Sequence, residues 1–257
     1  MSNAAQTPST GPTSAASAGP SGEPAPASTA DTLELLGLVA QLEHTAFVRL
    51  AGDCALAPDV AQRLALSRFA AAAVERRDRV LARVAELGGD PAAAMRQFDD
   101  VLTEFDERTQ PSSWWERLLK AYVGYGVADD FCRIAAQGLD ERSRAVVLEV
   151  LDDASHAELA VAELDEAGSR DGVLSSRLAL WGRRLVGEAL GTVQRLLTQR
   201  PALERLVSAG TEPAADAPGE AGNTSAGATA TPNAPAKVFG ELTAQHTRRM
   251  SRLGLTA

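Results

Sequence analysis

The chain has 257 residues, of which 45% are hydrophobic and 23% are charged, and its formal net charge at pH 7 is −9. This composition supports one hydrophobic core, and the acidic balance works against general binding of nucleic acid, which needs excess positive charge. No stretch approaches the roughly 18 to 20 apolar residues of a membrane-spanning helix, which excludes an integral membrane protein of that kind.

Two segments are poor in large apolar residues and consist mainly of Ala, Ser, Thr, Pro and Gly. Such segments cannot bury enough surface to offset the entropy that is lost on ordering. We therefore predict a disordered tail over 1–30, a helical bundle over 31–207, a disordered linker over 208–236, and a C-terminal helix over 237–257 that docks on the bundle. The tail lacks the features of a secretory signal, and the two cysteines lack a pairing or metal-binding spacing, so we expect a cytoplasmic protein.

Apolar residues recur with the helical period from about residue 32 to 207, which predicts an all-α fold. In chain order we expect long helices over 31–52, 58–89, 113–138, 140–168 and 173–200, and a shorter helical connection over 91–105. Ser113 and Glu116 have the capping-box spacing, Asp140 caps the fourth helix, and Pro201 breaks the fifth, which continues to about 207. This order is typical of a four-helix bundle with an additional fifth helix at its side.

Three of these helices place a carboxylate in their inward-facing apolar row. Glu43 lies in the row of the first helix, and Asp153 lies in that of the fourth, where His156 follows one turn later at the edge. Asp130 completes the row of the third helix, and we expect its neighbour Asp129 to point elsewhere. The pattern thus predicts several buried acidic groups.

An isolated buried carboxylate is costly, so it is normally paired, protonated or bound to a metal. In one alternative, each of these acids forms its own buried ion pair with a basic side chain. Alternatively, an Asp-x-x-His pair joined by single acids from other helices is how di-metal sites are built in helix bundles, and such donors suit iron or manganese. The pattern alone leaves both alternatives open.

The second helix departs from the pattern of a di-metal site. Its apolar row predicts that Glu75 and Asp78 face away from the core, while Arg76 and Arg77 occupy inward positions. Where a di-metal bundle needs Glu-x-x-His, this helix has Ala73 and Arg76. Two of the expected ligands are therefore missing.

Several segments resemble the ferritin-like proteins of actinobacteria: Leu35-Leu-Gly-Leu-Val-Ala with Glu43, Lys120-Ala-Tyr-Val-Gly124, Val147-Leu-Glu-Val-Leu-Asp-Asp153 with His156-Ala-Glu158, Trp181-Gly-Arg-Arg-Leu-Val-Gly-Glu-Ala-Leu190 and His246-Thr-Arg-Arg-Met250. These proteins are similar to the tRNA methylthio-isopentenyl-adenosine hydroxylases, which are non-haem di-iron monooxygenases. The resemblance covers about residues 32–207 and the last helix.

The resemblance implies a di-iron site with single acids from the first and third helices and acid-x-x-His pairs from the second and fourth. The residues that match this pattern are Glu43, Asp130, Asp153 and His156. The second pair falls on Ala73 and Arg76, in agreement with the helical period.

Three arrangements of this site remain open. In the first arrangement, the Arg76 guanidinium, a permanent cation, replaces the metal charge and pairs with Glu43, Asp130 or Asp153 in a metal-free core. Alternatively, its aliphatic stem carries the charge out to solvent. In the third arrangement, one iron or manganese ion is bound by the residual half-site of Glu43, Asp130, Asp153 and His156.

Two functions follow from these arrangements. The first is a ferritin-like bundle protein with a degraded di-iron site, which acts through interactions and forms a homo-oligomer through exposed helix faces. The second is a non-haem di-iron or manganese monooxygenase related to the tRNA-modifying hydroxylases, and only this alternative has a nucleic acid partner. No motif places a Ser or Cys nucleophile beside one of the three histidines, so we name no catalytic residue.

Overall fold

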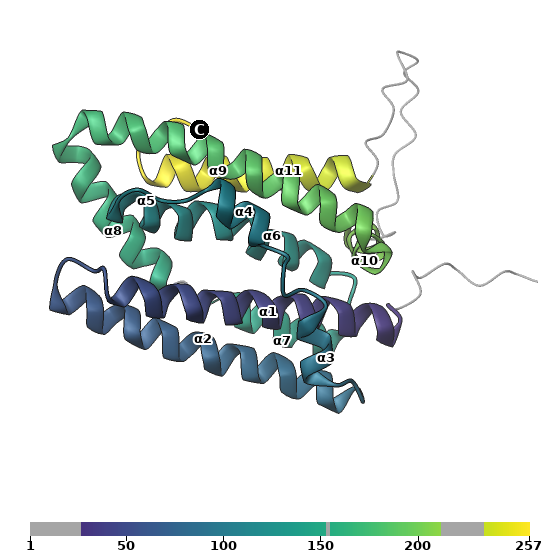
Figure 1. The fold of residues 1–257 in the computed structure, drawn as a ribbon. Coiled ribbons are helices and arrows are strands. Elements are labelled where there is room, and N and C mark those ends of the chain that lie inside the picture. Colours follow the sequence, from purple (N-terminus) through teal and green to yellow (C-terminus); the bar gives the residue numbers. More distant parts are fainter. Residues whose placement is uncertain (1–26, 153–154, 212–233) are drawn as a thin grey trace, which may run out of the picture.

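Helices make up the regular secondary structure of the described residues (Figure 1). The computed structural model describes residues 27–152, 155–211 and 234–257. The predictions for residues 1–26, for most of the linker and for Asp153 fall outside these ranges. The expected all-α fold is confirmed for the residues that are described.

Four helices form a bundle. Helices α1 (Thr29–Cys54) and α2 (Val60–Glu86) are joined by a short turn, and they pack against α6 (Tyr125–Ala136) and α7 (Glu141–Leu151). The side chains of Ser28 and Asp59 accept hydrogen bonds from backbone N–H groups in the first turns of α1 and α2. These caps satisfy donors that have no partner within the helix, which explains where both helices begin.

The connection between the second and third long helices contains α3 (Pro91–Arg96) and α4 (Thr103–Arg108). Helix α3 crosses α1 at Gly37, where a Cβ atom would collide with the carbonyl oxygen of Ala94. Gly88 ends the preceding helix with a φ of 79°, which favours glycine. Small residues thus let this connection lie directly on the bundle.

The third long helix is not uniform. It consists of α5 (Trp114–Leu119), the π-helical turn η1 (Lys120–Gly124) and α6. The predicted cap is confirmed, because the Ser113 hydroxyl accepts a hydrogen bond from the Glu116 N–H at 3.2 Å. The Glu116 carboxylate accepts from the Ser112 N–H at 2.6 Å, one residue before the partner that a capping box would give it.

The fourth predicted helix is interrupted. Helix α7 ends at Leu151, and α8 (Ser155–Arg170) leaves in a different direction (Figure 1). The Arg133 guanidinium donates to the Leu151 carbonyl oxygen, which would otherwise be one of the unpaired acceptors at the end of α7. The expectation of one helix over 140–168 was therefore wrong in this detail.

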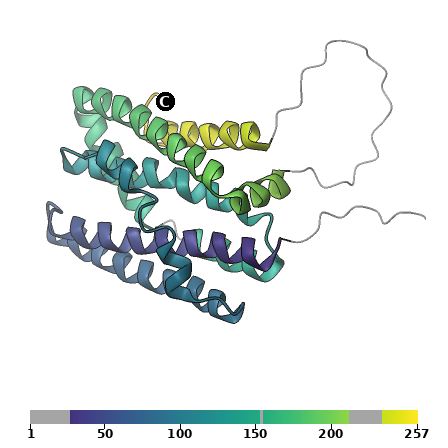
Figure 2. The ribbon, with the colours of Figure 1, turned by 45° about the vertical axis from the view of Figure 1, so that its right-hand side comes forward.

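A second layer covers α6 on the side away from α2 (Figure 2). It contains α9 (Gly172–Gln199), α10 (Pro201–Thr211) and α11 (Ala234–Arg252), and α11 packs on α6, α9 and α10. Pro201 starts α10 at a position where a missing N–H costs nothing, and the helix runs beyond residue 207 into the predicted linker. None of the described helices is long and apolar enough to cross a membrane.

Candidate functional site

The centre of the bundle contains a buried ion pair between α1 and α2. The Arg76 Nε atom lies 2.9 Å from Glu43 Oε2, and the two side chains are only 8% and 10% exposed. Glu75 and Asp78 are exposed, as the helical period predicted. Arg76 therefore pairs with an acid in the core, as the first of the three arrangements expects, and its side chain does not extend to solvent as in the second.

Ala73 lies fully buried one turn before Arg76 on the same face of α2. Its methyl group offers no donor atom to a metal, and the guanidinium of Arg76 carries only N–H donors and a permanent charge. At the two positions where the resemblance places an acid-x-x-His pair, α2 therefore provides no metal ligand.

A polar cavity of about 40 Å³ lies beside this ion pair. Its polar lining comes from Glu43 and Arg49 of α1, Arg76 of α2, and Tyr125 and Asp129 of α6. This volume is large enough to hold ordered water. Burial raises the pKa of the Asp129 carboxyl above its ordinary value, although the charges of Arg133, Arg249 and Arg76 oppose this rise.

The orientation of the two neighbouring acids of α6 differs from the prediction. Asp129, expected to point elsewhere, lines the polar cavity, whereas Asp130 is buried toward α11. In η1 the Tyr125 N–H donates to the carbonyl of Lys120, five residues back, and this extra residue rotates α6 relative to α5 by about 100°. The apolar row that predicted the inward side of Asp130 is therefore not one continuous face.

Asp130 forms a bidentate ion pair with Arg249 of α11. Arg249 Nη2 donates to Asp130 Oδ1 at 2.8 Å, and Nη1 donates to Oδ2. The guanidinium crosses α6 at Gly126, where a Cβ atom would lie 2.8 Å from Arg249 Nε. Because Gly126 and Asp130 are one turn apart, a single arginine binds across this face and attaches α11 to the bundle.

The other two predicted ligands cannot be placed in the same way. Asp153 lies outside the described residues, and His156 belongs to α8, but its side chain also lies outside them. Among the residues whose side chains are described, no group of three or more His, Cys, Asp or Glu residues is arranged to hold a metal ion. Glu43 and Asp130 each bind an arginine, and they do so on different sides of α6.

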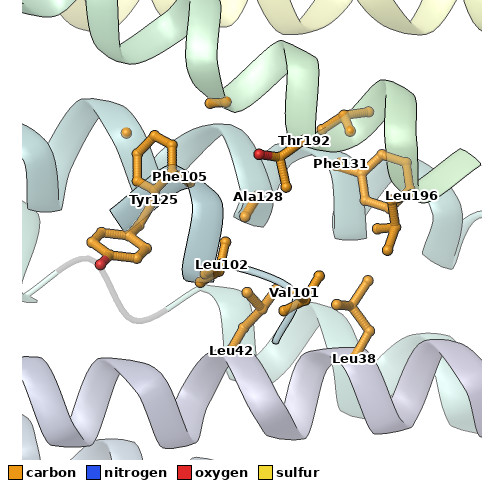
Figure 3. Close-up of a pocket in the computed structure, with 13 residues that line it drawn as sticks. Leu38, Leu42, Val101, Leu102, Phe105, Tyr125, Ala128, Phe131, Thr192 and Leu196 are labelled. Atoms are coloured by element: carbon orange, nitrogen blue, oxygen red, sulfur yellow. The ribbon is translucent and has the colours of Figure 1, made fainter. Parts of the chain in front are cut away.

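An apolar pocket (Figure 3) lies next to the polar cavity, with which it shares lining residues. It is lined by aromatic rings and aliphatic side chains from α1, the segment before α4, α4, α6 and α9, including Leu38, Phe105, Phe131 and Leu196. The pocket shares Leu42, Tyr125 and Ala128 with the polar cavity, and its volume is about 30 Å³. The α9 residues that line the pocket, Ala189, Thr192, Val193 and Leu196, are all buried.

Sequence reasoning missed Asp129 and Arg249 as members of the buried polar network. For Arg249, a signal was available in the sequence. The apolar row of α11 is interrupted by His246, and Arg249 follows one turn later. Asp129 could not have been found from an apolar row, because the π-helical turn that rotates it toward the cavity has no pattern of its own in the sequence.

Comparisons with known proteins agree with this architecture at the level of the fold. A family model described as a ferritin-like domain of actinomycetes matches residues 28–210. A search among curated proteins finds no match to the chain. Since the matched region includes α1 to α9 and nearly all of α10, the chain belongs to the ferritin-like domain family of actinomycetes.

Proposed function

We propose that this protein is a ferritin-like bundle that works without a di-metal centre and acts through binding rather than through oxygen chemistry. The observation that carries the proposal is the buried Arg76–Glu43 ion pair, with 2.9 Å between Nε and Oε2. A guanidinium in this position supplies the positive charge that a buried carboxylate requires.

The donor chemistry argues against a di-iron centre. Such a centre needs several carboxylates to offset two divalent cations and imidazoles to complete each coordination sphere. Here Ala73 contributes a methyl group, Arg76 would repel a metal ion in its vicinity, and Asp130 is held by Arg249. We therefore assign the buried polar network a structural role.

Metal content tests the proposal. We expect protein purified without chelators, and then reloaded anaerobically with ferrous iron or manganese, to contain close to no metal by elemental analysis. The double substitution Ala73→Glu with Arg76→His restores the acid-x-x-His pair, so it should raise the metal content by about one ion per chain. The matched control, Ala72→Glu with Glu75→His, has the same spacing one residue away from the buried face and should bind no more metal than the parent protein.

The same measurement decides between the proposal and its alternatives. One metal ion per parent chain would indicate the residual half-site of Glu43, Asp130, Asp153 and His156, with iron or manganese as cofactor. Two ions would overturn the proposal and favour a non-haem di-iron or manganese monooxygenase related to tRNA-modifying hydroxylases. An RNA substrate would still have to approach a protein with a net charge of −9.

A binding role also implies partners. We propose self-association as the first interaction to test, because large apolar side chains are exposed around the turn between α1 and α2; these are Val48, Leu56, Val60 and Leu64. We further propose a cytoplasmic location, in keeping with the free thiols of Cys54 and Cys132.

A further inference from the structure

An open cleft with charged walls lies next to the polar cavity, on its outer side. It has a volume of about 300 Å³ and is bounded by α1, by α4, α5 and the segment between them, and by η1 and the start of α6. Its charged and phenolic lining residues are Arg49, Asp53, Asp106, Arg117, Lys120 and Tyr125. Arg49 and Tyr125 also line the polar cavity, so these two side chains form the wall between the two spaces.

The carboxylates of the cleft are shared between several donors. Asp53 lies 3.1 Å from Arg117 Nη1 and 3.8 Å from Arg49 Nη1. Asp106 Oδ1 lies 2.7 Å from Lys120 Nζ and also accepts a hydrogen bond from the Tyr125 hydroxyl at 2.7 Å. The three cations that line the cleft thus face two carboxylates, which leaves an excess of one positive charge in a protein whose net charge is −9.

Two further observations concern these cations, of which Lys120 also donates to the Thr109 carbonyl oxygen at 3.0 Å. The Arg49 Nε atom is buried and has no hydrogen-bond partner within the described part of the chain. Burial lowers the pKa of the Lys120 ammonium group, and the nearby charges of Arg49 and Arg117 lower it further, although Asp106 opposes both effects. An additional anion in the cleft would relieve this repulsion.

We propose that this cleft is a binding site for a small oxyanion ligand, with its carboxylate or phosphate group held by Arg49, Arg117 and Lys120. Guanidinium groups bind such oxygens through parallel N–H donors, and the low exposure of Arg49 strengthens the interaction relative to one at the open surface. Thr45 and Gln110 provide hydrogen-bonding groups for the remainder of the ligand. The proposal does not depend on the metal content of the bundle.

Tyr125 has a supporting role in this site. Burial raises the pKa of its phenol far above the ordinary value, so the hydroxyl stays protonated and donates to Asp106. The Arg49 guanidinium carbon lies 4.9 Å from the centre of the Tyr125 ring, which positions the guanidinium by a cation–π contact. The Tyr125 ring therefore orients Arg49 directly, and its hydroxyl binds Asp106, the acid that pairs with Lys120.

The first experiment uses the full chain without substitutions. Inorganic phosphate and succinate, each titrated at constant ionic strength, should cause saturable shifts of the Arg49 and Arg117 side-chain Nε–Hε signals in NMR spectra. The signal of Arg177, which pairs with Glu116 outside the cleft, should not shift. A response to phosphate alone or to succinate alone identifies which oxyanion fits the cleft, whereas equal shifts at all three arginines, or none, would overturn the proposal.

A matched pair of variants tests the site by calorimetric titration of the same two anions. Arg117→Gln removes one cation from the cleft and should weaken binding at least about tenfold, and Arg49→Gln should have a similar effect. Arg177→Gln removes the same charge elsewhere and should leave the affinity unchanged. Far-UV circular dichroism verifies that each variant is folded, and undiminished binding in folded Arg117→Gln would contradict the proposed site.

Discussion

At the scale of single residues, the buried pair of Glu43 and Arg76 makes a clear energetic prediction. Arg76→Ala leaves a buried carboxylate without this partner, and such a loss costs about 3 to 5 kcal/mol in the free energy of unfolding. The double substitution Glu43→Leu with Arg76→Met removes both charges and should recover most of that stability. Urea unfolding of the three proteins measures both effects.

A control for this prediction lies one turn along the same helix. Arg79 pairs with Glu149 at 2.7 Å, but these side chains are 51% and 65% exposed. An exposed pair is worth about 0 to 1 kcal/mol, so Arg79→Ala should have little effect. Similar decreases in the free energy of unfolding for Arg76→Ala and Arg79→Ala would contradict the prediction that the buried pair contributes more than an exposed one.

The residues of the polar network also show which features were predictable. The inward position of Arg76 followed from the helical period of α2, which is a regular α-helix throughout. Its partner could not be chosen among Glu43, Asp130 and Asp153, because periodicity places a residue on a face but does not say which neighbouring helix it meets. Pairing depends on tertiary packing, which the sequence pattern does not contain.

At the scale of elements, the third long helix explains why the prediction for Asp129 and Asp130 was wrong. Helical periodicity assumes the same rotation at every residue, and the π-helical turn η1 adds a residue to one turn. In addition, α6 packs against α1 and α7 on one side and α9 and α11 on the other. Because apolar residues lie on both sides of α6, its sequence pattern does not indicate which face borders the polar cavity.

Helix α11 contains a histidine that should make the protein sensitive to acid. His246 is 3% exposed, and neither ring nitrogen has a hydrogen-bond partner within the described residues. Burial and the nearby charge of Arg249 lower its pKa from 6.5 to about 4. Between these values the unfolded chain binds a proton that the folded protein does not, so the free energy of unfolding decreases as the pH falls through this range.

The substitution His246→Leu isolates this contribution. Between pH 7.5 and pH 5 the parent protein should lose on the order of 1 to 2 kcal/mol more than the variant in urea unfolding, since each unit of pKa shift corresponds to about 1.4 kcal/mol. At neutral pH the variant should be at least as stable, because it lacks two unpaired buried nitrogens. Identical pH dependence of the two proteins would contradict the prediction.

At the scale of the whole molecule, local signals predicted the order of helices better than their continuity. Caps at Ser113 and Asp140, and the apolar period of the long helices, indicated an all-α bundle that the structure and the family match agree on. The break after Leu151 and the extension of α10 to Thr211 were not predicted. At the break, Arg133 donates to the end of α7, and along the extension Gly210 packs closely on the Ile134 carbonyl oxygen of α6. Such contacts between distant segments are not visible in a local sequence pattern.

The last prediction concerns assembly of the whole molecule. Val60 and Leu64, one turn apart on α2, are 64% and 53% exposed, and burial of such a pair between two copies would favour a dimer. We expect light scattering to give a mass above that of one chain, and Val60→Glu with Leu64→Glu should return it to the monomer value. Val173 and Leu180 of α9 are 72% and 62% exposed, so the same double replacement there is the control. A monomeric parent protein, or equal dissociation of both variants, would refute self-association through this end of α2.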